Sequence, residues 1–572
     1  MKKLSILDSA FLMIEKRETP MHVGGLNLFS LPDGADEQTF LHTLAESLRT
    51  ADELQPPFGQ RLNTGRLGVL GPMYWQRDDS LDLDYHIRHS ALPRPGRYRE
   101  LFSLVSRLHG TLLDRNRPLW EMHLIEGLQN RQFAIYSKYH HAAIDGVKSV
   151  HLTQSMMSTN PDDRIHQSPL SMAAMERYRA SLALPRPPTE QEIRNVADFL
   201  KATYDSSVHL TTALKRFASV WTGSGGALAM PWHDVPHTSL NTTVDGARRF
   251  VAQSWPFARI HAVGKALDGT FNDAVLAMCA GALRIYLQSR NELPAQSLKA
   301  MVPISLRREG DIDSSNAVGA ISADLATHIA DPIKRFMTIQ ASTRAGKEMY
   351  KDMSPQEASL FMQMTQMPGL LLMPLGLIAR FPPFSTVISN VPGPRKTMYW
   401  NGARLEGVYP ASIVTEGIAM NITLVTCGDQ VDFGIIACRR TMPQVQRLID
   451  DMETALVELE EAAGLASSKK KPKAKSASGA AAKAKAKSKA KAKAKPKAKT
   501  KAKTSAAPKT RAKSTQTRVK SRAKAKAKAK AKATSKARPK TKAATRASGT
   551  SRPRTGPAAK KRQSVRPKSV AK

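Results

Sequence analysis

The sequence predicts an α/β protein of two lobes followed by a separate basic tail, and three observations support this. The first 466 of 572 residues are too many for one ordinary hydrophobic core, because single cores stop growing near about 250–300 residues. Strand-like and helix-like segments occur in both halves of this body. From residue 467 onward the chain becomes rich in Lys and Ala and has no aromatic side chain. We therefore expect lobes at 1–160 and 245–466, a crossover with helices at 161–244, and a tail at 467–572.

The first lobe contains the most informative motif of the chain. Residues 132–139 are rich in aromatic and β-branched side chains and predict a strand, which His140 and His141 follow directly. Gly146 then opens a helical stretch that should end before Pro161, because proline disfavours helix at the residue before it. The histidines therefore lie at a strand–helix junction, where catalytic groups can face a cleft on a rigid support.

The second lobe is predicted from local signals. Asn272 is expected to be the N-cap of a helix, with Phe271 and Leu276 at the spacing of a hydrophobic staple. Residues 421–426 and 431–438 predict a hairpin. A final amphipathic helix is predicted by one apolar face, formed by Val445, Leu448, Ile449, Met452, Leu456 and Leu459.

Composition limits where the protein works. Three cysteines with no CxxC pair indicate a reducing compartment without disulfides or a zinc knuckle. Asp8 interrupts the N-terminus before a signal peptide can form. The longest apolar run, 369–379, is much shorter than the roughly 20 residues of a spanning helix. We expect a cytoplasmic protein with peripheral contact to the inner membrane or to a lipid body.

The motif His140-His141-Ala142-Ala143-Ile144-Asp145-Gly146 suits proton transfer, because the ordinary pKa of imidazole, about 6.5, lies near neutrality. A solvated strand edge or a satisfied core pair would also explain two adjacent histidines. A metal site is a further alternative, although no other His, Cys or Asp cluster completes the ligands. A Ser-His-Asp hydrolase is disfavoured, because no Gly-x-Ser-x-Gly motif supplies the serine.

The surrounding motifs favour one family. From Leu4 to about Leu465 the body resembles the bacterial wax ester synthase/diacylglycerol acyltransferases, which belong to the His-x-x-x-Asp CoA-dependent acyltransferases. Besides the histidine motif, the resemblance depends on Asp84-Tyr85-His86-Ile87-Arg88-His89, Arg117-Pro118-Leu119-Trp120-Glu121, Asn272-Asp273, Pro303-Ile304-Ser305-Leu306-Arg307, Ser389-Asn390-Val391-Pro392-Gly393-Pro394 and Asp432-Phe433-Gly434. Each motif alone is weak, but six in the right order are specific. The long tail departs from the usual family pattern.

This resemblance implies a two-lobed fold like that of chloramphenicol acetyltransferase, with a tunnel between the lobes. The implied reaction transfers a fatty acyl group from acyl-CoA, a substrate, to diacylglycerol or a long-chain alcohol, and it needs no cofactor and no metal. His141 is the expected general base, and His140 is expected to orient or wall the site. Asp145 is expected to hold the loop through a cation, with Arg307 as its partner. Gly146 is expected to permit a backbone geometry or a close approach that other residues would not.

For several other candidate residues the sequence allows a functional and a structural interpretation. Asn272 is either an oxyanion donor or a helix cap, and Asn390 either lines the tunnel or stiffens a turn. Pro118 and Trp120 are expected to be structural support, as is Asp432. The Met-rich stretch 361–378 is either a lipid-facing wall or plain core.

The tail carries 40 of the 87 Lys and Arg residues and no Asp or Glu, so the body is nearly neutral and the formal charge of +39 belongs to the tail. Because it cannot bury enough apolar surface to offset its ordering entropy, we expect it to be disordered. It resembles the Lys/Ala-rich tails of linker-type histones, and its partner is expected to be DNA or anionic lipid. A solvated tail without a partner is the remaining alternative.

Overall fold

The computed structural model describes residues 2–50, 53–65, 68, 71–144, 146–165, 168–181, 215, 218–219, 226–305, 318–351, 353, 355–372 and 375–465. Residues Met1–Lys473 form one compact unit. The predicted disorder of the tail, the roles of Asp145 and Arg307, and most of the crossover lie outside the described residues. Of the helices that the structure describes, none is long and apolar enough to cross a membrane.

The helices are α1 (Ile6–Ile14), α2 (Glu37–Arg49), α3 (Leu83–His86), α4 (Tyr98–His109), α5 (Gly146–Ser155), α6 (Met172–Ser181), α8 (Phe257–Ala266), α9 (Phe271–Gln288), α10 (Pro332–Glu348), α11 (Pro355–Leu372) and α12 (Arg447–Ala462), with a 3-10 helix η2 (Ser239–Asn241). The strands are β1 (Lys2–Lys3), β2 (His22–Ser30), β3 (Gln60–Asn63), β4 (Tyr74–Arg77), β5 (Ile87–Ala91), β6 (Trp120–Glu126), β7 (Gln132–His140), β8 (Arg248–Pro256), β9 (Lys299–Ser305), β10 (Val318–Asp324), β11 (Thr386–Val391), β12 (Tyr399–Trp400), β13 (Ala403–Ala411), β14 (Met420–Cys427) and β15 (Gln430–Cys438).

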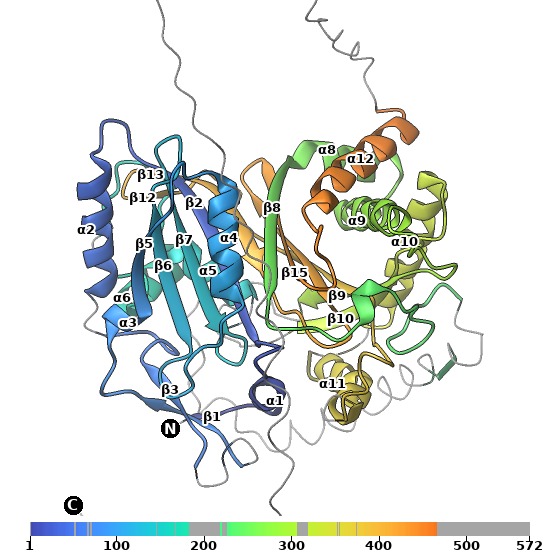
Figure 1. Cartoon of the computed structure of the whole chain (residues 1–572), viewed down its shortest axis with the longest axis horizontal. Helices are drawn as coiled ribbons and strands as arrows, with labels where there is room; N and C mark the ends of the chain where they lie inside the picture. Colours follow the sequence, from blue (N-terminus) through green and yellow to red (C-terminus); the bar gives the residue numbers. More distant parts are fainter. Residues whose placement is uncertain are drawn as a thin grey trace, which may run out of the picture. The chain divides into compact units, whose positions relative to one another are not determined.

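The first lobe is built on a six-stranded sheet with the order β12-β13-β2-β7-β6-β5. Successive side chains of a strand point to opposite faces, and β7 shows this plainly. Phe133 and Ile135 pack into the cluster that contains Leu44 of α2, whereas Tyr136 packs on the other face with Val105 of α4. The two helices therefore cover opposite faces of this sheet (Figure 1). A separate three-stranded sheet has the order β1-β4-β3.

The second lobe is built on the six-stranded sheet β10-β9-β11-β14-β15-β8, in which β9, β11 and β14 run parallel and the outer pairs run antiparallel. Helices α8, α9, α10 and α12 pack on this sheet in one continuous apolar core (Figure 1). The predicted hairpin of β14 and β15 and the final helix α12 are both confirmed. With two sheets and flanking helices, the predicted two-lobed α/β class is confirmed.

The second half of the chain contributes two strands to the sheet of the first lobe. β12 and β13 come from the second half of the sequence, yet they pair at the edge of the first sheet beside β2. The motif Asp432-Phe433-Gly434 lies in β15 where β13 crosses it. A Cβ at Gly434 would overlap the carbonyl oxygen of Pro410, so only glycine permits this approach. The Asp432 carboxylate accepts hydrogen bonds from the Ser254 hydroxyl (2.6 Å) and the Val408 N–H (2.8 Å), which ties the two sheets together.

The Asp432 carboxyl should make stability depend on pH. Burial raises the pKa of Asp432 to about 6, although the bonds from Ser254 and Val408 act in the opposite direction. The unfolded chain ionises this group near its model value of 3.8, so stability should fall as the pH rises from about 4 to about 6, by up to about 3 kcal/mol. Asp432→Asn should lack this part of the dependence, as measured by urea unfolding across the same pH range. Equal pH slopes in the two proteins would contradict this assignment.

The helix that carries Asn272 begins differently from the prediction. Thr270 is the N-cap of α9, because its hydroxyl accepts from the Asp273 N–H (3.2 Å) and the Asp273 carboxylate accepts from the Thr270 N–H (2.9 Å). This reciprocal pair is a capping box. The prediction that Asn272 caps the helix is therefore wrong, since Thr270 already satisfies the free backbone donor. The Asn272 side chain is left for another contact.

Candidate active site

The chain is fixed by its backbone where β7 ends. The His140 N–H donates to the Leu119 carbonyl (3.0 Å), and the His141 N–H donates to the Met21 carbonyl (2.9 Å). The Ala143 N–H then donates to the His140 carbonyl (2.9 Å) and closes a turn before α5 begins. The predicted strand–turn–helix junction is confirmed. It is held from two sides, by the start of β6 and by the segment that precedes β2.

The two histidines of the motif lie in different surroundings. His140 is fully buried, with its Nδ1 accepting from the Ala142 N–H (3.1 Å) and its Nε2 3.5 Å from a carboxylate oxygen of Glu15. A ring whose Nδ1 accepts a backbone N–H carries its proton on Nε2. His141 is only half-buried, and its ring stacks on Phe11 of α1 with ring centroids 4.4 Å apart. Of the two histidines, His141 is therefore the more exposed.

Glu15 has a buried side chain, and the sequence did not reveal it as part of the site. Its carboxylate accepts from the Met21 N–H (3.0 Å) and pairs with the Arg115 guanidinium (2.9 Å). Burial alone would raise the pKa of Glu15, but the contacts with His140, Met21 and Arg115 outweigh it and lower this pKa. The Met21 carbonyl also accepts from the His141 N–H. Glu15 is therefore connected to His140 directly and to His141 through the backbone of Met21. No local pattern signals this contact, because Arg115 is 100 residues away in the sequence.

Gly146 does not have the predicted special geometry. Its φ is not positive, and a Cβ there would lie 3.6 Å from Val391, an ordinary contact distance. The expectation that only glycine fits at this position is therefore wrong. The contact is informative in another way, because Val391 belongs to β11 of the second lobe. It places the start of α5 against the end of β11.

An asparagine pair joins two elements of the second lobe near this contact. The Asn390 Nδ2 of β11 donates to the Asn272 Oδ1 at the start of α9 (2.7 Å). Asn272 is exposed and Asn390 is half-buried. Because the Asn272 carboxamide accepts through its oxygen, its Nδ2 hydrogens are kept for donation. The structure thus brings Asn272 and Asn390 together, and Asn390 neighbours the residue that Gly146 faces.

Pro118 and Trp120 support the start of β6. Trp120 is 2% exposed, its indole N–H donates to the Phe58 carbonyl (3.0 Å), and its ring stacks on His86 (4.4 Å between centroids). Pro118 is buried and forms an isolated bridge with Arg61. The carbonyl of Leu119, between them, accepts from the His140 N–H, so the motif contacts the histidine turn through a backbone hydrogen bond.

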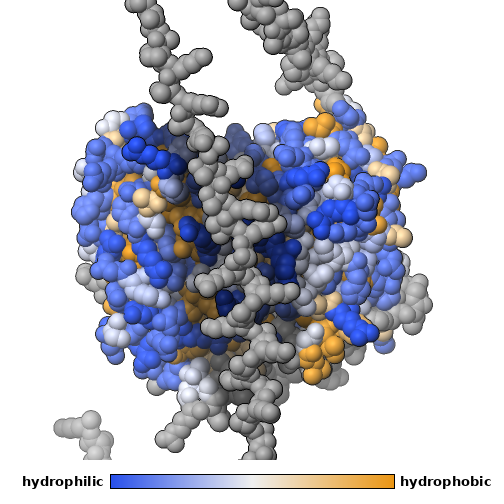
Figure 2. All heavy atoms as spheres, in the orientation of Figure 1, coloured by the Kyte–Doolittle hydropathy of each residue, from blue (hydrophilic) through white to orange (hydrophobic). Residues whose placement is uncertain are grey.

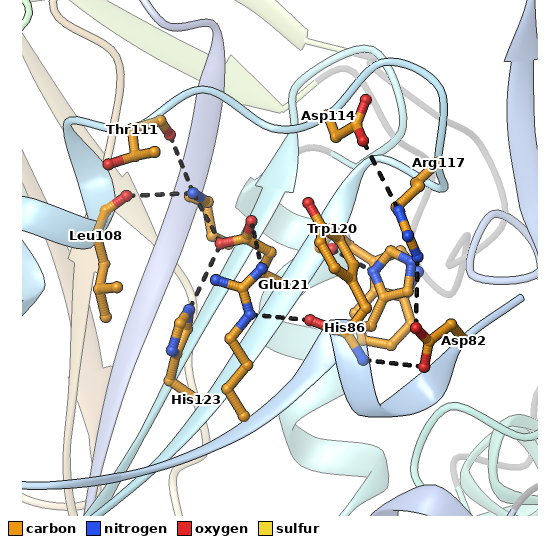
Figure 3. Close-up of polar contacts among 12 residues, drawn as sticks. Asp82, His86, Leu108, Thr111, Asp114, Arg117, Trp120, Glu121 and His123 are labelled. Carbon is orange, nitrogen blue, oxygen red and sulfur yellow. Dashed lines mark hydrogen bonds and ion pairs between the residues drawn. The ribbon is translucent and has the colours of Figure 1, made fainter.

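Two motifs far apart in the sequence meet beside β6. The Arg117 guanidinium lies 3.6 Å from the Asp82 carboxylate and 3.7 Å from that of Asp114, and it covers the Tyr85 ring at 4.0 Å. Figure 3 shows Arg117 between the two carboxylates, with His86 beside Trp120. These contacts account for the pairing of the two motifs within the fold.

A buried ionic network runs behind the histidines along β6 and β7. The Lys138 side chain is fully buried, and its Nζ lies 3.0 Å from Glu121 and donates to the carbonyls of Leu108 and Thr111. Glu121 also lies 3.5 Å from His123 (Figure 3). Burial would raise the pKa of Glu121, but His123 and Lys138 outweigh it and lower this pKa to about 2. The sequence did not single out this network, because an apolar strand gives no sign of which polar residue is buried.

The described residues contain no group of three or more His, Cys, Asp and Glu placed to hold a metal ion. Asp145 and Arg307 lie outside them, so their pairing stays a prediction. The predicted tunnel likewise stays a prediction. What the described residues show is a half-buried histidine on a rigid turn, a fully buried second histidine, and a pair of carboxamides in the second lobe beside the contact of Gly146 with Val391.

Comparison with known proteins gives consistent results. The model of the wax ester synthase/diacylglycerol acyltransferase catalytic domain matches residues 4–275, and that of the C-terminal domain of the same family matches residues 314–460. A probable diacylglycerol O-acyltransferase of Mycobacterium tuberculosis is 45% identical over 461 residues, which cover 80% of this chain and 98% of the relative. An O-acyltransferase of Acinetobacter baylyi is 38% identical over 454 residues, covering 79% of this chain and 96% of the relative.

A solved structure agrees with these relatives. The wax ester synthase/diacylglycerol acyltransferase of Marinobacter aquaeolei superimposes with a TM-score of 0.64 at 40% identity, covering 81% of this chain and all of that chain. The matched residues belong to the body, and they include strands of both six-stranded sheets and the histidine turn. The chain belongs to the wax ester synthase/diacylglycerol acyltransferase family.

Proposed function

We propose that this enzyme transfers a fatty acyl group from acyl-CoA to the hydroxyl of diacylglycerol or a long-chain alcohol, with His141 as the general base. The observation that supports this role best is the contrast between the two histidines. His140 is sealed and its Nδ1 is occupied by a backbone N–H, whereas His141 is half-buried on a fixed turn. A base must reach its proton within hydrogen-bond distance, which only an accessible ring can do.

The reaction follows from these positions. His141 removes the hydroxyl proton as the acceptor oxygen attacks the thioester carbonyl, and the same ring returns the proton to the CoA thiolate that leaves. The oxyanion that forms needs a preorganised donor. The Asn272 Nδ2 fits this need, because Asn390 fixes the carboxamide through its oxygen. Direct transfer balances without a cofactor and without an acyl-enzyme.

The acceptor class is the part of the function that an experiment must settle. The relatives' names include a diacylglycerol O-acyltransferase and a wax ester synthase, and both acceptors present a primary or secondary hydroxyl on a long apolar body. We expect the purified enzyme to form labelled ester from radiolabelled acyl-CoA with both acceptor types dispersed in detergent, and to release CoA in equal amount. CoA release with no ester from any acceptor would contradict the proposal, because it would indicate hydrolysis.

The tail supports a second, separate role. Its 40 cations without an acidic residue favour a tether to anionic lipid or to DNA. A lipid target would agree with a cytoplasmic enzyme held at the inner membrane or at a lipid body. Removal of residues 467–572 should leave turnover in detergent unchanged. It should abolish the tail's binding to DNA or to anionic vesicles, and in the full chain this binding should weaken steeply as the salt concentration rises. Gel shifts and vesicle sedimentation across a salt series separate the two targets. Loss of turnover in detergent would show that the tail belongs to the enzyme's fold or site.

A further inference from the structure

The apolar side chains that are most exposed among the described residues gather in two short segments. Leu375 is 69% exposed, Phe381 52% and Met13 51%. Leu375 and Phe381 lie in the turn that follows α11, and Met13 lies at the end of α1. Met364, on α11 itself, is 39% exposed. Figure 2 shows hydrophobic side chains gathered at the surface in the region of α11.

The two segments flank one turn of the chain. A Cβ at Gly417 would press against the backbone of Ile378, so the turn that contains Glu416 and Gly417 is packed directly on the segment after α11. On its other side the Arg248 guanidinium donates from one nitrogen to the carbonyls of Glu18 (2.8 Å) and Val414 (3.3 Å), so the segment after α1 lies against the start of the same turn. Lys16 follows Met13 by less than one helical turn of sequence. The exposed apolar side chains therefore border the same part of the surface.

The segment after α11 is fixed by backbone hydrogen bonds. The Leu377 N–H donates to the Leu372 carbonyl, and the N–H groups of Arg380 and Phe381 both donate to the Leu377 carbonyl (3.0 Å each). Ile378 is buried beneath them. Leu375 and Phe381 are thus presented to solvent by a turn whose backbone and underside are satisfied. These two side chains are not part of the buried core of the body.

Cations accompany the exposed apolar groups. The Arg380 guanidinium lies 5.8 Å from the centre of the Phe381 ring, and Lys16 and Arg17 are exposed beside Met13. Glu18 and Glu416 lie in the same region, so three cations face two carboxylates and the cations are in excess by one. Apolar side chains flanked by Lys and Arg are typical of surfaces that lie at a lipid interface, where the apolar groups enter the acyl boundary and the cations meet anionic headgroups.

We propose that Met13, Leu375 and Phe381, with Lys16, Arg17 and Arg380, form a docking surface for a phospholipid leaflet that contains anionic lipid. The place of α1 supports this choice over a protein partner. Phe11 of α1 stacks on His141, and Met13 lies two residues further along. Docking at this surface brings the leaflet next to the helix that lines the candidate base. In this respect the inference rests on the proposed function, because an insoluble acceptor would then leave the leaflet beside the site.

A fluorophore sensitive to polarity tests the surface independently of the tail. Leu375→Cys in the full chain carries the probe, and Met337→Cys on α10, at a position that is 46% exposed, is the matched control. The native thiols interfere little, because Cys279 and Cys438 are buried and burial raises the pKa of Cys427 to about 12. On vesicles of phosphatidylcholine with phosphatidylglycerol, we expect a blue shift and quenching by lipid-borne quenchers at 375 and neither at 337.

Each other outcome overturns the docking surface. Sedimentation with vesicles but no change at 375 would mean that the tail or another face holds the protein. Equal changes at 375 and 337 would mean non-specific adsorption. A shift at 375 that grows with protein concentration in the absence of vesicles would mean that a second copy of the chain covers the surface. The absence of sedimentation with any vesicle would exclude lipid binding altogether.

A second measurement separates this inference from the enzymatic proposal. Leu375→Asp and Phe381→Asp should each weaken binding to the vesicles at high salt on the order of tenfold, while Met337→Asp should not. All three variants should keep wild-type turnover with acceptors dispersed in detergent. If the wild-type enzyme forms no ester with any acceptor but the probe at 375 still enters the bilayer, the proposed reaction fails and the docking surface stands. If turnover in detergent is normal and the probe stays in water, the docking surface fails alone.

Discussion

His141→Ala should lower the rate of ester formation by about 10²–10⁴-fold while leaving the fold intact. His141 is half-buried and its ring stacks on the partly buried Phe11, so its replacement should disturb the core less than replacement of a fully buried side chain. The turn that carries it is held by the His141 N–H and the Met21 carbonyl, and the substitution keeps both groups. Single-turnover formation of labelled ester in detergent is the measurement, with circular dichroism and thermal unfolding as the test of folding.

His140→Ala is the informative companion variant. This side chain is fully buried, accepts the Ala142 N–H and faces Glu15, so its removal leaves a cavity, an unpaired donor and a less compensated carboxylate. We expect His140→Ala to lose both stability and activity, and His141→Ala to lose activity alone. If His141→Ala retained the wild-type rate, or if both variants lost stability equally, the assignment of the base would be wrong.

The site could be predicted from the sequence wherever local chemistry decides the structure. The strand before His140, the helix that Gly146 opens and the hairpin of β14 and β15 each follow from patterns within about ten residues. The cap of α9 was misassigned because Thr270 and Asn272 are both good caps, and only the reciprocal bond with Asp273 decides between them. The family resemblance supplied the two lobes, but it did not show how they are joined.

What could not be predicted depends on contacts between distant segments. β13 pairs with β2 across more than 370 residues, and no periodicity in either strand specifies that partner. Glu15 lies in a stretch without any motif, and its role becomes visible only when Arg115 and His140 surround it. Lys138 is similar, since a lysine in an apolar strand is usually placed at an edge, whereas this one is fully buried.

Lys138→Met should destabilise the protein by about 3–5 kcal/mol, because it leaves Glu121 buried without its closest cation. Arg88 remains 3.3 Å from the carboxylate, which limits the loss. The double variant with Glu121→Gln should be more stable than the sum of the single effects predicts, since it removes the uncompensated charge itself. Lys334→Met, at an exposed position of α10, is the matched control and should change stability by no more than about 0.5 kcal/mol. Urea unfolding at neutral pH gives these free energies for five proteins, namely wild type, Lys138→Met, Glu121→Gln, the double variant and Lys334→Met.

The same series tests whether the network supports the catalytic turn. Lys138 lies two residues before His140 and on the same face of β7, so a shift of the strand should reach the histidines. Below its unfolding transition, Lys138→Met should therefore form ester more slowly, and the double variant should recover part of the rate together with part of the stability. Additive losses of stability would show that Lys138 and Glu121 act separately. A full rate in a strongly destabilised single variant would show that the network holds the lobe without positioning the histidines.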